Sequence, residues 1–367
     1  MITLNKVRLY LIAGFVSLLL VLSTAHADKK LAVDKVEGPL SVIVLGSGGP
    51  IATAEGRASA GYLIFTDGKP RILMDAGGGS FQRLAASGAT IPDLDIILLS
   101  HLHIDHMGDL SPMMKTIYFH ARGKNIAAGI PFPPGRTAPV RIFGPNANGV
   151  IFPPPTGLPA VPQYPSSKDF VDGHFDANVG LDRYLNIFSR AISGGIFKYT
   201  VTNASPDWTT PASEQTLIDE DGLVVKSIGV NHGPVPALGF RIEYKGKSIV
   251  YSGDTSSKGD NMIALSQDAD LLIYDTAITD TLPAATPGDG VFFALHTTPT
   301  RMGQVAAAAQ VKKLVLSHLT PVTSPRIKEV KHLIRDAGYT GKIKAAKDLK
   351  VFNIEEDDDD DKDKNHD

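Results

Sequence analysis

Apolar residues of the chain gather in short runs that glycine and proline separate, which is typical of strands and turns. Residues 95–101 form a continuous apolar run, the pattern of a strand covered on both faces. Strands are predicted at residues 39–46, 60–66, 71–75, 95–101, 222–232, 237–255, 270–277, 313–318 and 348–354. Helices are predicted at residues 77–88, 107–122, 181–193, 302–310 and 324–338.

Strands and helices alternate in both halves of the chain. This order predicts an α/β protein in which two sheets pack face to face and helices cover them. Residues 237–255 hold two apolar runs linked by Gly246, Lys247 and Ser248, which predicts a hairpin. We expect a single large domain over residues 28–354.

Residues 123–213 differ in composition from the rest of the chain, because they are rich in proline and glycine. Loops of this length are usually functional lids or insertions. We therefore predict an insertion that helps to shape a substrate pocket. A passive insertion is the alternative.

The N-terminus has the pattern of a secretory signal. Lys6 and Arg8 precede an apolar run of about fourteen residues, which ends before the small-residue sequence Ala25-His26-Ala27. A transmembrane anchor is the alternative, but the run is shorter than the roughly 20 residues that a span needs. We predict a signal peptide over residues 1–27, a periplasmic or secreted location, and no stable membrane anchor after cleavage.

Composition and charge narrow the class of protein. The chain has no cysteine, so any metal must be held by His, Asp or Glu. The net charge is −3, and residues 355–367 alone carry nine acidic and two basic residues, so the body of the chain is close to neutral. We predict an acidic disordered tail, with cation or partner binding as its alternative. A nearly neutral body does not indicate a nucleic-acid surface.

The stretch LLSHLHIDHMGDL, residues 98–110, concentrates the candidate chemistry. His101 and His103 lie two residues apart at a strand end, so both side chains project to the same side. Asp105 and His106 follow at the turn into a helix and can reach a neighbouring point. The pattern indicates a two-metal site rather than surface or packing histidines. Imidazole and carboxylate ligands suit zinc, and they can also bind iron or manganese.

One loop cannot complete two coordination spheres, so further ligands are expected at other strand ends. His232, Asp254 and His318 each close a predicted strand. A carboxylate can give one oxygen to each of two ions, and Asp254 is the candidate for this bridge. Each of these residues taken alone could instead be a packed polar side chain.

Together, the H-x-H-x-D-H pattern, the strand-end histidine, Gly-Asp-Thr and Ser-His-Leu-Thr-Pro resemble the metallo-β-lactamase fold superfamily. The resemblance is closest to the branch of ribonuclease Z and bacterial metallo-arylsulfatases. It covers most of residues 39–354, including Gly-Ser-Gly-Gly-Pro at 46–50 and Asp75, whose implied role is structural support near the metals. The implied fold is a four-layer αββα sandwich.

The resemblance also implies a ligand set for two divalent ions, of which Zn²⁺ is expected. The first ion would be held by His101, His103 and His232, and the second by Asp105, His106 and His318. Asp254 would bridge them. A hydroxide shared by the ions would be the nucleophile, because coordination lowers the pKa of water. Asp105 is an additional candidate for orienting that hydroxide.

Protonation of the leaving group needs another residue. The ribonuclease-like branch uses a Glu and a His, and the matching positions here are Asp275 and His296. The resemblance therefore implies that His296 is a general acid or oxyanion stabiliser, oriented by Asp275. A hydrogen-bonded pair without a catalytic step is the alternative.

The expected function is an exported hydrolase of small anionic esters, either sulfate esters or phosphodiesters. Many ribonuclease Z enzymes carry a long arm that grips transfer RNA between the positions of His232 and Asp254, and here the link is short. We therefore expect no nucleic-acid partner. Lactone or β-lactam hydrolysis on the same site is the alternative activity, and a metal-dependent binding module is the alternative without turnover. Whether the chain forms a homodimer stays open.

Overall fold

A computed structural model describes residues 30–130, 136, 138–151, 164–188, 197–209, 213–281 and 289–354. The predicted signal peptide at 1–27 and the predicted acidic tail at 355–367 lie outside these residues. Within the described ranges, no helix is both long enough and apolar enough to cross a membrane.

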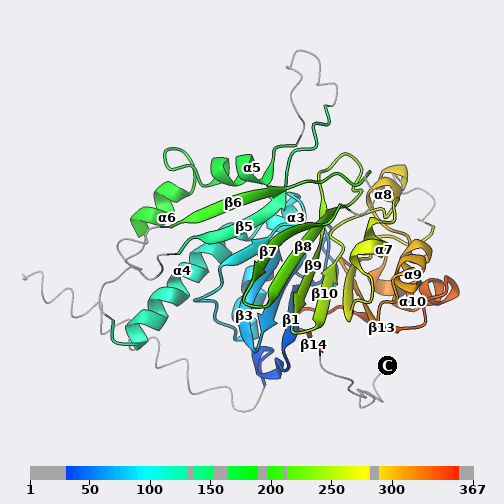
Figure 1. Cartoon of the computed structure of the whole chain (residues 1–367), viewed down its shortest axis with the longest axis horizontal. Helices are drawn as coiled ribbons and strands as arrows, with labels where there is room; N and C mark the ends of the chain where they lie inside the picture. Colours follow the sequence, from blue (N-terminus) through cyan, green and yellow to red (C-terminus); the bar gives the residue numbers. More distant parts are fainter. Residues whose placement is uncertain are drawn as a thin grey trace, which may run out of the picture.

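In this part of the chain the strands form two sheets of seven (Figure 1). The first sheet has the order β14 (Val351–Ile354), β1 (Leu40–Gly46), β2 (Gly61–Thr66), β3 (Lys69–Ala76), β4 (Ile96–Leu98), β5 (Val140–Pro145), β6 (Tyr199–Ala204). The second has the order β13 (Lys342–Ala345), β12 (Lys313–Ser317), β11 (Leu271–Asp275), β10 (Lys247–Tyr251), β9 (Leu238–Tyr244), β8 (Leu223–Gly229), β7 (Gln215–Glu220). Strands β3 to β6 pair in parallel, as do β10 to β13.

Helices cover the outer face of each sheet. Figure 1 shows α4 and α6 on the left, α5 above β6, and α7, α9 and α10 on the right. The helices are α2 (Ser80–Ser87), α3 (Ile104–Met107), α4 (Leu110–Ala127), α5 (Ser167–His174), α6 (Asp182–Phe188), α7 (Asn261–Leu265), α8 (Asp289–Leu295), α9 (Pro299–Ala308) and α10 (Ile327–Asp336). Two 3-10 turns, η1 (Val33–Lys35) and η3 (Ser324–Arg326), complete the elements. The predicted αββα sandwich is confirmed.

Strand β1 shows why the sequence produces four layers. All seven of its residues are buried. Leu40, Val42 and Val44 pack between the two sheets, whereas Ile43 and Leu45 pack under the helices of the first sheet. Because successive side chains of a strand point to opposite faces, a strand covered on both sides needs an unbroken apolar run.

The range predicted as an insertion, residues 123–213, needs correction. It contains β5 and β6, which pair in parallel within the first sheet, and it also contains α5 and α6. Strand β5 itself ends in Gly144 and Pro145, so glycine and proline in this range do not mark the absence of a sheet. The predicted helix at 181–193 is present as α6 over its described part.

The link between His232 and Asp254 is short, as predicted. Strands β9 and β10 pair in an antiparallel hairpin, and the turn between them consists of Lys245 and Gly246. Both turn residues have positive φ, 49° and 73°, as a two-residue hairpin turn of type I′ requires. This interval therefore holds two strands and a tight turn, with no room for a long arm.

Candidate metal centre

The candidate ligands meet because they all stand at the carboxyl ends of strands. His101 follows β4, His232 follows β8 and Asp254 follows β10, while Asp275 ends β11 and His318 follows β12. The loops after such strands open at the same edge of an α/β structure, which is where binding residues usually lie. Every predicted site residue is buried except His103, which is partly exposed.

Three histidines form the first group. One nitrogen from each of His101, His103 and His232 lies within 4.8 Å of the others. His232 donates from Nδ1 to the Leu295 carbonyl oxygen at 2.8 Å, which leaves Nε2 facing the group, 3.4 Å from His103 Nδ1. We call these residues the three-histidine site.

Two aspartates and two histidines form the second group, Asp105, His106, Asp254 and His318. His318 Nε2 is 3.2 Å from Asp105 Oδ2, and His106 Nε2 is 3.4 Å from the same oxygen. We call these residues the acidic site.

Asp254 lies between the two sites. Its Oδ1 is 3.3 Å from His106 Nε2, on the acidic side. Its Oδ2 is 3.2 Å from His318 Nε2, also on the acidic side, and 3.9 Å from both His101 Nε2 and His232 Nε2, on the three-histidine side. The carboxylate thus contacts both ligand sets, which is the position predicted for a bridge.

The donor atoms fit metal ions. Within the described residues, His101 Nε2, His106 Nε2 and Asp254 Oδ1 are buried and have no hydrogen-bond partner, a costly arrangement unless an ion satisfies them. Ligands at the usual zinc distances are about 3.3 Å apart around a tetrahedral ion. Four donor pairs of the acidic site and the pair of His103 and His232 are 3.2 to 3.4 Å apart.

The two sites differ in electrostatics. Burial lowers the pKa of His101 and of His103, and it lowers the pKa of His232 to about 4. These imidazoles are therefore neutral at pH 7, the form that binds a metal.

In the acidic site, charge interactions outweigh burial. Burial would raise the pKa of Asp254, but His318 and His106 hold it well below its usual range. Burial would likewise lower the pKa of His318, yet Asp254 and other neighbours raise it to about 10. The carboxylates are ionised and attract positive charge, whether from protons or from a metal ion.

Asp75 supports the acidic site, as the family resemblance implied. His106 Nδ1 is 2.8 Å from Asp75 Oδ2, and the same oxygen accepts hydrogen bonds from Ser100 Oγ and from the Tyr251 hydroxyl. This contact turns His106 Nε2 toward the ligands. Asp75 has a φ of 53°, and such strained residues cluster at functional sites.

Two glycines let the site close tightly. A Cβ on Gly49 would lie 2.7 Å from the His318 ring, and a Cβ on Gly77 would lie 2.0 Å from the Asp105 carbonyl oxygen. Both positions therefore require the absence of a side chain.

His296 and Asp275 also come together at this centre. His296 Nδ1 is 2.7 Å from Asp275 Oδ2, and Asp275 Oδ1 is 3.3 Å from His318 Nδ1. Burial opposes the charged form of His296, but Asp275 outweighs it and raises its pKa. The Asp275 carboxylate orients the His296 ring by a hydrogen bond and lies within ion-pair distance of His318, so the shorter side chain of Asp reaches both imidazoles.

Several contributing groups are not evident from the sequence. Tyr251 and Ser100 both reach Asp75, and the Leu295 carbonyl oxygen orients His232. The strand-end position of Ser100 was a usable signal. The contacts of Tyr251 with Asp75 and of Leu295 with His232 join segments that are distant in sequence. No local sequence pattern predicts them.

Arg122 and Lys124, two basic residues that follow the stretch LLSHLHIDHMGDL in the sequence, lie away from the metal centre. Both are in the last turns of α4, and at 1.5 Å per residue Lys124 is about 20 Å along the helix from Leu110. Lys124 pairs with Asp93 at 2.5 Å on the exposed surface.

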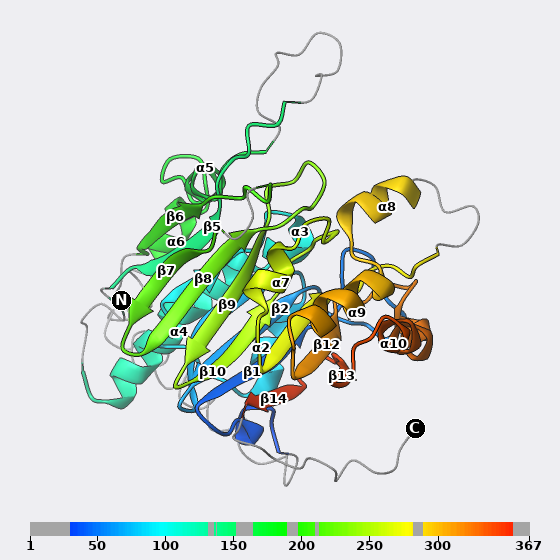
Figure 2. The same cartoon turned by 45° about the vertical axis from the view of Figure 1, so that its right-hand side comes forward.

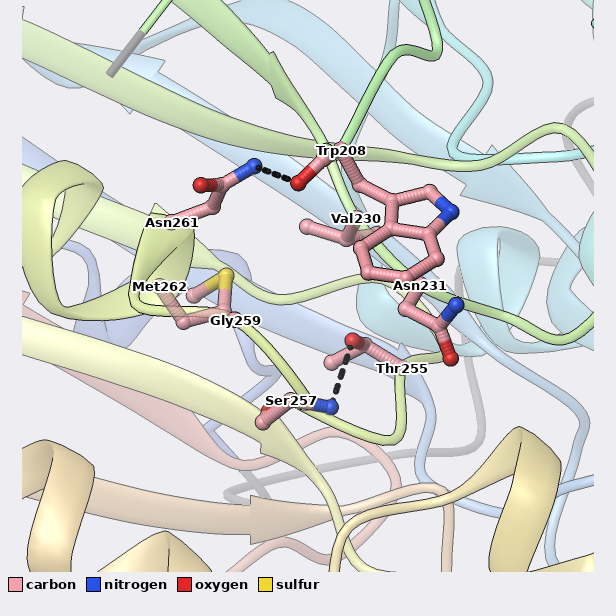
Figure 3. A pocket seen from close by; sticks show the side chains of 8 residues that line it. All are labelled: Trp208, Val230, Asn231, Thr255, Ser257, Gly259, Asn261 and Met262. Atoms are coloured by element: carbon pink, nitrogen blue, oxygen red, sulfur yellow. Dashed lines mark hydrogen bonds between the residues drawn. The ribbon is translucent and has the colours of Figure 1, made fainter. Parts of the chain in front are cut away.

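A pocket adjoins the centre on the side of α7 (Figure 3). It is lined by Trp208, Val230, Asn231, Thr255, Ser257, Gly259, Asn261 and Met262. Asn231 and Thr255 each lie next in sequence to a ligand. Asn261 donates to the carbonyl oxygens of Trp208 and Gly229 at 3.0 and 2.9 Å. These bonds fix the segment of the single tryptophan against the end of β8.

Fold and site together define an αββα protein with His and Asp clusters that fit divalent metal ions. The chain belongs to the metallo-beta-lactamase superfamily, a family of metal-dependent hydrolases, and the family model matches residues 54–318. The predicted membership is confirmed.

Curated relatives and solved structures agree with this assignment. The protein "Ribonuclease Z" of Mycobacterium bovis (strain BCG / Pasteur 1173P2) is 28% identical over 313 residues, which cover 84% of this chain and 96% of the relative. The metallo-beta-lactamase fold protein YhfI from Bacillus subtilis has a TM-score of 0.55 at 21% identity, covering 86% of this chain and 99% of its own. The short form of human tRNase Z has the same TM-score and identity, covering 86% and 99%.

The relatives' names bear on the expected partner. Relatives named Ribonuclease Z oppose the expectation that no nucleic acid is involved, and they do not support restriction to small esters. The short hairpin between His232 and Asp254 is observed, but the conclusion drawn from it was too strong.

Proposed function

We propose that this protein hydrolyses phosphodiester bonds with two divalent metal ions. The observation that carries the proposal is the position of Asp254, whose carboxylate contacts histidines of both ligand sets. The relatives named Ribonuclease Z favour a phosphodiester over the sulfate ester that the sequence left open.

When bound, the two ions would supply a water of lowered pKa as nucleophile and positive charge for the attacked group. His101, His103 and His232 would hold one ion, and Asp105, His106 and His318 the other. Asp105 Oδ2 lies near the acidic ligands, where it can also accept a hydrogen bond from that water.

His296 would donate the proton to the leaving oxygen. Asp275 binds its Nδ1, so a proton on Nε2 points away from that carboxylate. His296→Ala is expected to keep both metals and to slow turnover by about 10²- to 10⁴-fold, most for poor leaving groups. Metal analysis and rates across leaving groups of graded acidity test this role, and an unchanged rate would remove His296 as the acid.

We further propose zinc as the metal, because imidazole and carboxylate ligands suit it. Elemental analysis of protein purified without added metal tests this. Two equivalents of iron or manganese would contradict it.

A substrate panel tests the activity. Metal-replete protein would be given a chromogenic phosphodiester, sulfate ester, lactone and β-lactam, together with a precursor transfer RNA that carries a 3′ trailer. We expect turnover of phosphodiesters above all others, abolished by chelation. Two bound ions with no phosphodiester turnover would refute the proposal, and faster sulfate or β-lactam hydrolysis would replace it.

Export is a separate proposal that rests on residues 1–27. The mature protein is expected in the periplasm or medium with an N-terminus near Asp28. N-terminal sequencing of the full-length gene product tests this, and an intact Met1 in the cytoplasm would contradict it.

A further inference from the structure

Helix α8 presents apolar side chains to the outside of the molecule. Val291 is 59% exposed, and Phe292 and Phe293 are only half-buried. Figure 2 shows α8 at the upper right, beyond α7 and α9 and apart from the sheets. Neighbouring apolar groups with so little cover are typical of a binding surface.

The same helix is joined directly to the metal centre. The backbone N–H of His296 donates to the Phe292 carbonyl oxygen at 2.9 Å. The rings of Phe292 and His296 stack with centroids 6.5 Å apart and an angle of 24°. At the end of α8, Leu295 accepts the hydrogen bond from His232. Phe292 therefore stands beside the group that would protonate the leaving oxygen.

Two more large, exposed apolar residues lie close in sequence to residues of the centre. Ile104 lies between His103 and Asp105 in the sequence, yet it is 77% exposed. Ile51 is 48% exposed and lies two residues from Gly49, which packs against the His318 ring. A substrate group that reaches out of the site would thus contact hydrocarbon.

We propose that α8 forms a subsite for an apolar, aryl-bearing leaving alcohol, with Phe292 as its main contact. The inference rests on the proposed phosphodiester hydrolysis. Water adds to phosphorus, the bond from phosphorus to the aryl oxygen breaks, and that oxygen takes the proton of His296. The products are a phosphate monoester and a phenol-type alcohol.

Two matched substrates test the subsite. Methyl 4-nitrophenyl phosphate has an apolar ring, and methyl 3-carboxy-4-nitrophenyl phosphate adds a charge to the same ring. The wild-type protein is expected to prefer the uncharged ring by about 10- to 100-fold in kcat/KM. Phe292→Ala should remove most of this preference while both metals stay bound, and Phe292→Leu, which keeps an apolar side chain, should retain most of it.

The outcomes separate the two proposals. If the wild-type protein hydrolyses both rings equally, or if Phe292→Ala slows both by the same factor, the subsite is refuted and the hydrolase stands. Preference for the precursor RNA over the uncharged aryl diester also refutes the apolar subsite. If metal-replete protein hydrolyses no phosphodiester, both the proposed function and the subsite are refuted.

Discussion

The two halves of the metal centre share Asp254 but differ in charge. The three-histidine site contributes neutral imidazoles, whose pKa values burial lowers. In the acidic site, Asp105 and Asp254 are ionised. An ion in the first site would keep most of its charge, whereas carboxylates would neutralise much of it in the second. The acidic site therefore offers an ion more negative charge than the three-histidine site does.

The comparison predicts the largest effect where the halves meet. Asp254→Ala should lose both ions, because one change removes a ligand from each site, and turnover should fall on the order of 10³-fold or more. Elemental analysis and phosphodiester turnover measure the two effects. The control is Asp336→Ala, which removes an acidic side chain from the exposed side of α10. This variant should retain both ions. Two tightly bound ions in Asp254→Ala would show that the halves do not share this ligand.

Single-site changes should separate the halves. His232→Ala is expected to release one equivalent of metal and to keep the acidic site filled, with turnover reduced by about 10²- to 10³-fold. Calorimetric titration of chelated protein measures the two equivalents. His332→Ala, at a surface histidine that is 77% exposed in its side chain, should bind both as the wild type does. Loss of both equivalents in His232→Ala would mean that the sites cannot fill independently.

The sequence predicts the ligands of both halves because the end of an apolar run marks the end of a strand. His101, His103 and His318 directly follow apolar runs, and the runs become β4 and β12. The difference in charge could also be predicted, because Asp105 adds a carboxylate to one half beyond the Asp254 that both halves share. The orienting contacts could not, because Tyr251 and Asp75 are 176 residues apart and meet only when the two sheets pack.

The strands that the sequence did not reveal have a common physical reason. β6, β7 and β13 stand at the ends of their sheets, where most positions are at least partly exposed and no long apolar run occurs. A search for continuous apolar runs finds covered strands and passes over these. Proline and glycine around β5 had the same effect on the range taken for an insertion.

A weaker, one-sided effect is expected from the partner of His106. Asp75→Asn keeps the size of the side chain but removes the charge that binds His106 Nδ1. Metal affinity of the acidic site should fall by about 10- to 100-fold, while the three-histidine site is little changed. Competition with a graded series of chelators measures each equivalent. Equal weakening of both sites would indicate that Asp75 holds the whole centre and not one half.

The smallest effect should come from Ser100, which contacts both halves. Its Oγ is 2.7 Å from Asp75 Oδ2 and 3.1 Å from His101 Nδ1. Ser100→Ala removes these side-chain contacts but keeps the backbone bond from Ser100 N to Asp75 Oδ1. A hydrogen bond of this kind contributes about 1 kcal/mol, so each equivalent should bind roughly fivefold more weakly. The same chelator series measures this, and Ser111→Ala, on α4, serves as the matched control. A change confined to one equivalent would show that the serine belongs to that half alone.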